Sequence, residues 1–200
     1  IIILLSVILQ AGCAEEPVTL FRLMPASYTG ADFNNELDYS TQLETKFNIY
    51  TFRNFYNGGG VGLGDINNDN LIDIFMTSNM GKNTLYLNKG NFRFEDITES
   101  AGIHGEGWST GVSIADVNGD GFADIYVCKS GNIAGARSRN ELYINNGNLT
   151  FTERAAEFGI DEQGNSTHGI FFDYDKDSDL DLYLLKNFPK AISTFNLKDN

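Results

Sequence analysis

Short runs of alternating apolar side chains, at a period of two, recur along the chain and predict β-strands. Such runs cover residues 72–76, 125–128 and 182–185. The intervening positions are also largely apolar, so we expect both faces of these strands to be buried. Two further segments, LYLNKGNFRF and LYINNGNLTF, predict hairpins whose turns contain Lys89-Gly90 and Asn146-Gly147. The pattern therefore indicates a protein of many short strands.

The strand pattern belongs to an internal repeat. Residues 83–103 align without gaps with residues 140–160, and nine of the 21 aligned positions are identical. Acidic segments begin at Asp65, Asp116 and Asp173, which are 51 and 57 residues apart. The unit is therefore 51 residues long, and the second copy carries six more. A fixed period of this kind is the sequence signature of a repeat architecture.

The six additional residues of the second copy fall between Asp124 and Asn140, within the stretch GNIAGARSR at residues 131–139. We interpret them as a loop insertion rather than a new element. The insertion brings Arg137 and Arg139 into an otherwise acidic chain. We therefore expect these two arginines to lie in a loop that faces a partner.

Each unit predicts the order strand, acidic loop, strand, long loop, strand, tight turn and strand. Four strands in a unit of about 40–50 residues is the arrangement of a β-propeller blade. We predict an all-β fold, a partial β-propeller of four-stranded antiparallel blades, over residues 47–200. Two blades are complete and the third is partial, so the chain is expected to be a fragment of a longer protein. An early strand is also predicted over residues 47–56.

Composition narrows the classes of function. Hydrophobic residues make up 42% of the chain, which is enough for a packed core and excludes a wholly disordered chain. The formal net charge of −13 repels phosphate backbones, so we expect no nucleic-acid partner. A protein or a glycan is the expected ligand, and the sequence does not indicate an oligomeric state.

The acidic segments are candidate metal sites, because each places side-chain oxygens at positions 1, 3, 5 and 9. A backbone carbonyl at position 7 can complete a shell of six or seven oxygens. The three ligand sets are Asp65, Asn67, Asp69, Leu71 and Asp73; Asp116, Asn118, Asp120, Phe122 and Asp124; and Asp173, Asp175, Asp177, Asp179 and Asp181. Hard oxygen ligands in a flexible cage suit Ca²⁺ better than Mg²⁺. The sequence therefore predicts up to three calcium sites.

An EF-hand and a metal-free turn are the two other interpretations of these loops. An EF-hand needs a glutamate at position 12 and flanking helices, whereas position 12 here is Met76, Val127 or Leu184 and the flanks are strands. Solvated Asx-turns without metal remain an alternative. Position 6 needs a sharp turn, which Asn70 and Gly121 tolerate and Ser178 tolerates poorly, so the third loop is the least certain site.

The N-terminal residues resemble an export signal. Residues 1–9 are almost purely apolar, and twelve uncharged residues are too few to span a bilayer. Cys13 follows Ala-Gly, which resembles the lipobox of bacterial lipoproteins, although Gln10 departs from that pattern. We predict a signal remnant over residues 1–12, a lipid-anchored tether and N-terminal segment over residues 13–46, and a place in the bacterial cell envelope. An ordinary signal peptide with an incidental cysteine is the alternative.

The acidic loops and the repeat resemble FG-GAP/VCBS-type repeats, the blades of integrin-α-like propellers. Residues 20–187 are similar to the N-terminal part of bacterial ASPIC/UnbV-type repeat proteins. The resemblance implies that the loops bind calcium. It also implies that a complete propeller has about seven blades, more than this chain contains.

The sequence does not present a catalytic constellation. His104 and His168 occupy different places in the repeat, and Cys128 falls on a predicted inner strand, where a buried hydrophobe is expected. Trp108 precedes a strand and is expected to pack between blades. We therefore predict binding or scaffolding rather than catalysis. The alternatives are the non-catalytic part of a glycan-metabolising enzyme and a metal-free structural spacer.

Overall fold

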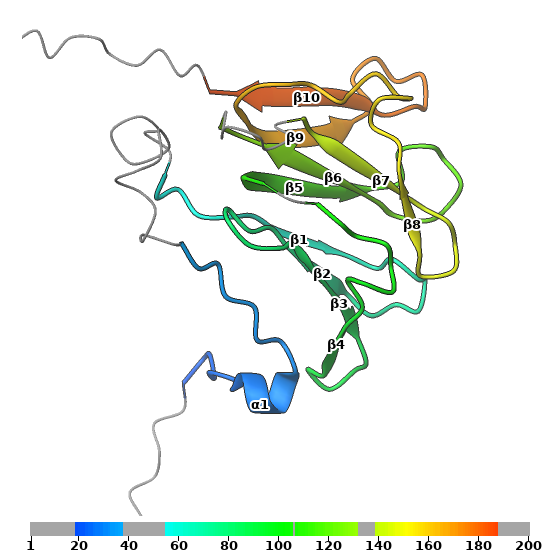
Figure 1. Cartoon of the computed structure of the whole chain (residues 1–200). Helices are drawn as coiled ribbons and strands as arrows, with labels where there is room; N and C mark the ends of the chain where they lie inside the picture. The colour runs from blue at the N-terminus through cyan, green and yellow to red at the C-terminus, as the bar shows by residue number, and fades with distance from the viewer. Residues whose placement is uncertain (1–18, 38–54, 106, 132–138, 188–200) are drawn as a thin grey trace, which may run out of the picture.

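The computed structural model describes residues 19–37, 55–105, 107–131 and 139–187 of the chain. Within these residues the chain forms one short helix, α1 (Ala26–Thr29), and ten strands (Figure 1). The first sheet contains β1 (Val61–Gly64), β2 (Asp73–Met76), β3 (Thr84–Asn88) and β4 (Phe94–Asp96). The second contains β5 (Ser109–Ala115), β6 (Asp124–Lys129), β7 (Glu141–Asn145) and β8 (Phe151–Glu153). The third contains β9 (Ser166–Phe172) and β10 (Asp181–Lys186).

The first two sheets are antiparallel meanders in chain order, β1-β2-β3-β4 and β5-β6-β7-β8. Their registers are equivalent: Phe75 lies opposite Leu85 in the first sheet, and Tyr126 lies opposite Leu142 in the second. The predicted order of four strands per unit is therefore confirmed for two units. The third sheet has β9 and β10 alone among the described residues, and the described strands do not close a ring.

The first strand of each sheet packs against the first strand of the next, so that β1, β5 and β9 follow one another across the molecule (Figure 1). Glycines permit this approach. A Cβ atom on Gly60 would lie 2.6 Å from the carbonyl oxygen of Thr110, and one on Gly64 would lie 2.5 Å from Ile114 Cγ2. One on Gly111 would lie 2.5 Å from Nδ1 of His168 in β9. The glycine-rich segment before the first acidic loop therefore serves close packing between sheets.

A shared apolar core joins the first two sheets. It is formed by buried side chains from both, namely Ile66, Phe75, Leu85, Leu87, Ile97, Ala101, Ile103, Val112, Ile125, Val127, Tyr143 and Phe151. Burial of apolar surface at about 25 cal/mol per Å² is the main stabilising term for such a layer. A second cluster around Tyr126 and Leu142 packs against Phe171 and Leu182 of the third sheet. Each sheet is therefore stabilised by its neighbour, as in a stacked repeat protein.

The N-terminal segment, residues 19–37, lies along the outer part of the first sheet. Arg93 stacks on the ring of Tyr28, with the guanidinium carbon 3.9 Å from the ring centroid. Asn35 donates from Nδ2 to Oδ1 of Asn79 at 2.7 Å, and the hydroxyl of Tyr86 lies 3.2 Å from Asp32 Oδ1. This helix and its flanks are therefore attached to the first sheet. No helix among the described residues is long and apolar enough to cross a membrane.

Three details differ from the sequence prediction. Phe55 and Tyr56 lie in a turn, and the rest of the strand predicted over residues 47–56 lies outside the described residues. Lys89 and Asn146, predicted within the hairpin turns, instead flank loops of three residues. Their backbone N–H groups donate to the carbonyls of Arg93 and Thr150 and close these loops. The prediction that both faces of the apolar strands are buried is right for β6 and wrong for β10, whose residues are mostly exposed.

Candidate metal centres

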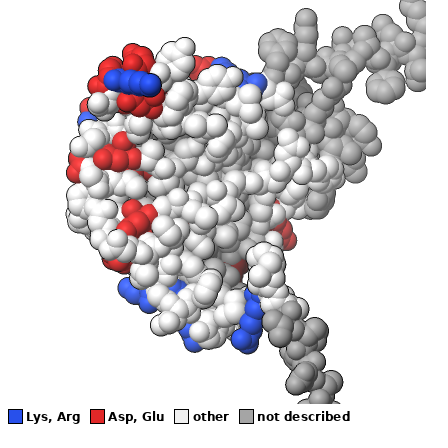
Figure 2. Space-filling model, turned by 180° about the vertical axis from the view of Figure 1, so that it is seen from behind, with Lys and Arg blue, Asp and Glu red and all other residues white. Residues whose placement is uncertain are grey.

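The three acidic loops connect the first two strands of each sheet and emerge at the same edge of the molecule (Figure 1). Figure 2 shows acidic side chains gathered in separate clusters along one edge of the surface. The loops follow the equivalent strands β1, β5 and β9, so their positions are set by the repeat.

All three loops share one backbone conformation. Positions 4 and 6 have positive φ angles between 59° and 90° in every loop; these residues are Asn68 and Asn70, Gly119 and Gly121, and Lys176 and Ser178. The prediction that position 6 turns sharply is confirmed, even at Ser178. L-residues with side chains other than Asn or Asp adopt this region rarely. The third loop therefore keeps the repeat's conformation at two residues that do not favour it.

The aspartate at position 1 organises the first two loops. Asp65 accepts backbone N–H bonds from Asp69 at 3.1 Å and from Asn70 at 2.7 Å. Asp116 accepts the equivalent bonds from Asp120 at 3.0 Å and Gly121 at 2.8 Å. Each carboxylate therefore lies inside its own loop, where it satisfies N–H groups that have no strand partner.

Positions 3 and 5 are linked directly in the first two loops. The amide of Asn67 donates to Asp69 Oδ2 at 3.0 Å, and that of Asn118 donates to Asp120 Oδ2 at 2.8 Å. The amide N–H thus compensates part of the carboxylate charge. The amide oxygens of both asparagines face inward, since each accepts the backbone N–H of its position 5.

In the first two loops the aspartate at position 9 is buried and connects the loop to the sheet, whereas Asp181 of the third loop is exposed. Asp73 accepts the backbone N–H of Ile66 at 2.9 Å and that of Asn88 at 2.7 Å. Asp124 accepts the N–H groups of Val117 and Asn145 in the same way. Burial raises the pKa of both carboxyl groups, and the backbone N–H bonds partly oppose that shift.

The third loop differs because position 3 is an aspartate. Asp173, Asp175 and Asp177 each offer a carboxylate oxygen, and these oxygens all lie within 4.8 Å of one another. Repulsion from Asp177 raises the pKa of Asp179, while the N–H of Asp179 lowers the pKa of Asp177. Among the described residues this is the one group of three carboxylates, thiolates or imidazoles with such spacing.

The donor sets fit a hard cation. Every side chain at positions 1, 3, 5 and 9 carries an oxygen, and in the third loop three carboxylates converge. Hard oxygen ligands of this number suit Ca²⁺. The structure thus brings together the predicted ligands at positions 1, 3 and 5 of the third loop, and their metal occupancy stays a prediction. The loop that the sequence made the least certain has the closest convergence of carboxylates.

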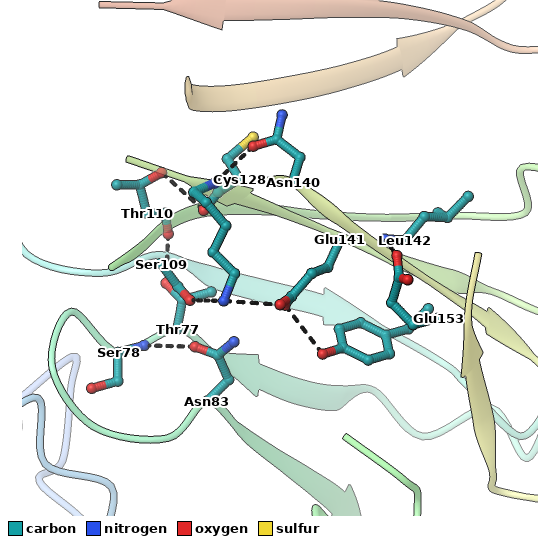
Figure 3. A network of polar contacts seen from close by, with 12 residues as sticks. Thr77, Ser78, Asn83, Ser109, Thr110, Cys128, Asn140, Glu141, Leu142 and Glu153 are labelled. Atoms are coloured by element: carbon teal, nitrogen blue, oxygen red, sulfur yellow. Dashed lines mark hydrogen bonds and ion pairs between the residues drawn. The ribbon is translucent and has the colours of Figure 1, made fainter. Parts of the chain in front are cut away.

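A buried polar network, which the sequence did not predict, lies between the first two sheets (Figure 3). The ammonium of Lys129, a fully buried side chain, lies 3.1 Å from Glu141 Oε2 and donates to Ser109 Oγ at 3.0 Å. The hydroxyl of Tyr143 donates to the same carboxylate at 3.1 Å. Burial raises the pKa of Glu141, whereas Lys129 lowers it. Alignment of the two units singles out both residues of this pair, because the first unit has the uncharged Ser78 and Thr84 at the equivalent positions.

The remaining predicted residues have definite places or lie outside the described residues. Cys13 and Arg137 lie outside them. Arg139 donates to Asp161 Oδ2 at 2.7 Å. Cys128 is buried, and burial raises its pKa to about 12, so it is a packing residue. Trp108 is 2% exposed and its ring centroid lies 5.2 Å from that of Phe55.

Repeated four-stranded sheets, each with an acidic loop after its first strand, define a repeat protein with propeller-type blades. The sequence profile of the FG-GAP-like repeat family matches residues 45–127 and 132–184. The chain therefore belongs to the FG-GAP-like repeat family.

Curated relatives extend this result. The chain is similar to cartilage acidic protein 1 of Xenopus tropicalis, with 36% identity over 138 residues, covering 65% of this chain and 20% of that protein. The human protein of the same name is 32% identical over 135 residues, covering 64% of this chain and 19% of that protein. The chain thus spans about a fifth of the length of these relatives. They are vertebrate proteins, so the resemblance to bacterial ASPIC/UnbV-type lipoproteins remains a prediction.

Proposed function

We propose that this FG-GAP repeat module binds calcium at its three acidic loops and serves in binding or scaffolding rather than catalysis. The observation that carries the proposal is the convergence of three carboxylates in the third loop, within a backbone conformation that all three loops share. Like charges held this close are costly unless a cation neutralises them. The first two loops present the same positions with asparagine in place of one aspartate.

Thermal unfolding of the full chain tests the calcium sites. Melting is measured in EDTA, and then in 10 mM Ca²⁺ or 10 mM Mg²⁺. A dissociation constant of about 10⁻⁴–10⁻³ M, typical of extracellular modules, gives about 1.4–2.7 kcal/mol of stabilisation per occupied site. We expect Ca²⁺ to raise the melting temperature and Mg²⁺ to raise it less. An equal melting temperature in EDTA and Ca²⁺ would overturn the proposal.

Variants of the third loop refine this experiment. Asp177→Asn removes one of the three converging carboxylates and should reduce the calcium-induced rise in melting temperature. Asp175→Asn restores the residue type that Asn67 and Asn118 supply in the other loops, so it should retain more of the rise. Glu99→Gln, at an exposed glutamate paired with Lys82, is the control and should leave the rise unchanged.

A metal-free spacer is the second candidate, and one observation favours it. The carboxylates of Asp73 and Asp124 each accept two backbone N–H groups, so the first two loops have a hydrogen-bonded framework of their own. This candidate requires that calcium leaves the melting temperature unchanged in every variant. The same unfolding experiment therefore separates the two functions.

We also propose that the protein is exported and lipid-anchored at Cys13 in a bacterial envelope. The support is the apolar run at residues 1–9 and the small residues before the cysteine. Expression of the chain with its native leader in a bacterium fed labelled palmitate should label the wild type and leave Cys13→Ser unlabelled. Equal labelling of both, or of neither, would contradict the anchor.

The partner of this module is proposed to be a protein or a glycan. The support is the abundance of connecting loops on a fixed scaffold, which is where binding residues concentrate. The loop of residues 131–139 remains the predicted contact. Its Arg139 already pairs with Asp161, so this side chain is oriented by the module itself.

A further inference from the structure

The first and second acidic loops touch each other through a side chain. The amide of Asn68 donates from Nδ2 to the carbonyl oxygen of Gly121 at 3.0 Å. Asn68 is position 4 of the first loop, and Gly121 is position 6 of the second. Their φ angles are 59° and 90°, so both belong to the left-handed positions that shape the loops. The bond therefore joins one turn-defining residue to another.

A second, buried connection runs between the same loops. Asn145 of β7 is 2% exposed, and its Nδ2 donates to the carbonyls of Ile66 at 2.7 Å and Ala123 at 3.1 Å. These carbonyls belong to position 2 of the first loop and position 8 of the second. The backbone N–H of Asn145 also donates to Asp124 at 2.8 Å. One side chain thus touches both loops.

The apolar core reinforces this connection. Ile66, inside the first loop, is 1% exposed and belongs to the core cluster that also contains Val112 and Ile125 of the second sheet. A change in the conformation of the first loop therefore moves a side chain packed against the second sheet. Packed interiors transmit such displacements because they contain few voids.

The second and third loops lack the exposed link. Position 4 of the second loop is Gly119, which has no side chain to reach the third loop. The repeat therefore contains one linked pair and one pair without this bond, in otherwise equivalent positions.

We propose that the first two loops form a coupled pair, in which a divalent cation at one raises the affinity of the other through Asn68 and Asn145. This inference rests on the proposed calcium sites. A cation that fixes the first loop also fixes Asn68, which holds Gly121 in the conformation that the second loop requires. Coupling between two sites is reciprocal, so occupancy of the second loop favours the first by the same factor.

Charge acts in the opposite direction. A cation in one loop weakens the attraction of the other loop for a second cation, and salt screens this effect over about 8 Å at physiological ionic strength. The hydrogen-bonded link is much less sensitive to salt. A comparison of variants at one fixed salt concentration therefore isolates the contribution of Asn68.

The test is a double-mutant cycle on the full chain, with Ca²⁺ as the ligand. Calorimetry gives the dissociation constants, and the amide signals of Gly119 and Gly121 report the second loop by NMR. Asp69→Asn weakens the first loop, and we expect it to lower the affinity of the second loop about fivefold, the lower end of usual couplings. In the Asn68→Gly background, Asp69→Asn should change the second loop's affinity less than twofold.

Asn91→Gly is the matched control, because Asn91 is another exposed asparagine with a positive φ, of 53°, outside the loops. It should leave the fivefold effect unchanged. The coupling is overturned, while the calcium sites stand, if Asp69→Asn leaves the Ca²⁺ affinity of the second loop unchanged. It is also overturned if Asn68→Gly and Asn91→Gly have the same effect on that affinity change. If the wild type binds no Ca²⁺, the proposed function itself fails and the coupling fails with it.

Discussion

The first and second units differ at single residues, and one such difference changes a buried hydrogen bond. Asn83 and Asn140 are equivalent: Asn83 accepts the backbone N–H of Ser78, just beyond β2, and Asn140 accepts that of Lys129, at the end of β6. The amide of Asn140 donates to the hydroxyl of Tyr126 at 2.8 Å and to Ser166 Oγ at 3.0 Å. Phe75 replaces that tyrosine in the first unit, and Nδ2 of Asn83 has no partner among the described residues. The first unit thus lacks the tyrosine hydroxyl, and its serine equivalent to Ser166, Ser109, accepts from Lys129 instead, so the buried Nδ2 of Asn83 stays without an acceptor in the described part of the chain.

Replacing that residue should repair the defect. In Phe75→Tyr the new hydroxyl can accept from Asn83, and we expect the free energy of unfolding to rise by about 0.5–1.5 kcal/mol, the net value of one hydrogen bond. Urea unfolding measures the change. The reverse variant, Tyr126→Phe, should lose a similar amount. A loss of stability in both variants would show that the first sheet lacks room for the hydroxyl.

The buried pair of Lys129 and Glu141 should be costly to break. In Lys129→Met the largely buried carboxylate of Glu141 loses its partner cation. We expect the free energy of unfolding to fall by about 3 kcal/mol near pH 8. The pKa of Glu141 is already raised by burial and rises further in this variant, so the folded state holds the proton more tightly than the unfolded state. Stability of the variant therefore falls as pH rises above the usual glutamate range, and the difference from the wild type shrinks toward acid pH.

Urea unfolding from pH 5 to pH 8 checks this dependence. Lys89→Met is the control, because Lys89 and Glu95 form an exposed pair 3.5 Å apart, and such pairs contribute little. A difference between Lys129→Met and the wild type that stays constant with pH would contradict the role given to Glu141.

At the scale of elements, the fold depends on the close approach of the first strands. A Cβ atom on Gly60 would meet the backbone of Thr110 and Gly111, which cannot rotate away. A Cβ atom on Gly62 would meet the side chains of Ile114 and Val112 at 3.1–3.2 Å, which can adjust slightly. Position 60 is therefore the stricter of the two.

We expect Gly60→Ala to destabilise the protein by about 2–3 kcal/mol, in the upper range of overpacking effects, and Gly62→Ala by about 1 kcal/mol. Thermal unfolding of both variants under one condition provides the comparison. If the order is reversed, the separation between the first two sheets is set by contacts other than the Gly60 backbone.

Much of this fold could be predicted from the sequence because the same strand pattern occurs in two complete units. The alternation at residues 72–76 and 125–128 and the turn glycines Gly90 and Gly147 identify strands and hairpins by local geometry. The Lys129–Glu141 pair was not predicted: the repeat shows that both residues replace Ser78 and Thr84, but contact between side chains of two strands, β6 and β7, is not encoded in a local pattern. The exposure of β10 was also missed, because its apolar alternation is the same as that of the buried β6. Burial depends on neighbours, which periodicity does not report.

At the scale of the whole molecule, the three sheets differ in how fully they are supported. Every residue of β6 is buried. The strand lies between β5 and β7 in its own sheet, and its side chains pack against the first and third sheets. The third sheet has two described strands, and Ile170, Tyr183 and Leu185 are at least half exposed. Regions with few buried contacts open more easily than the rest of a protein.

Hydrogen exchange should therefore distinguish the sheets. We expect the amides of β10 to exchange at least about tenfold faster than those of β6, because local opening of β10 exposes less apolar surface. Exchange measured by NMR or mass spectrometry on the full chain gives both rates. Equal protection would mean that the third sheet is supported by residues outside the described part of the chain.

The connection between β6 and β7 has a practical consequence. The second unit carries six more residues there than the first, yet the two strand pairs have the same register. The entropic cost of closing a loop grows slowly with its length, so insertions at this connection cost little stability. This connection is accordingly the place to graft a foreign peptide, and the module could serve as a display scaffold for a sequence inserted after Gly131.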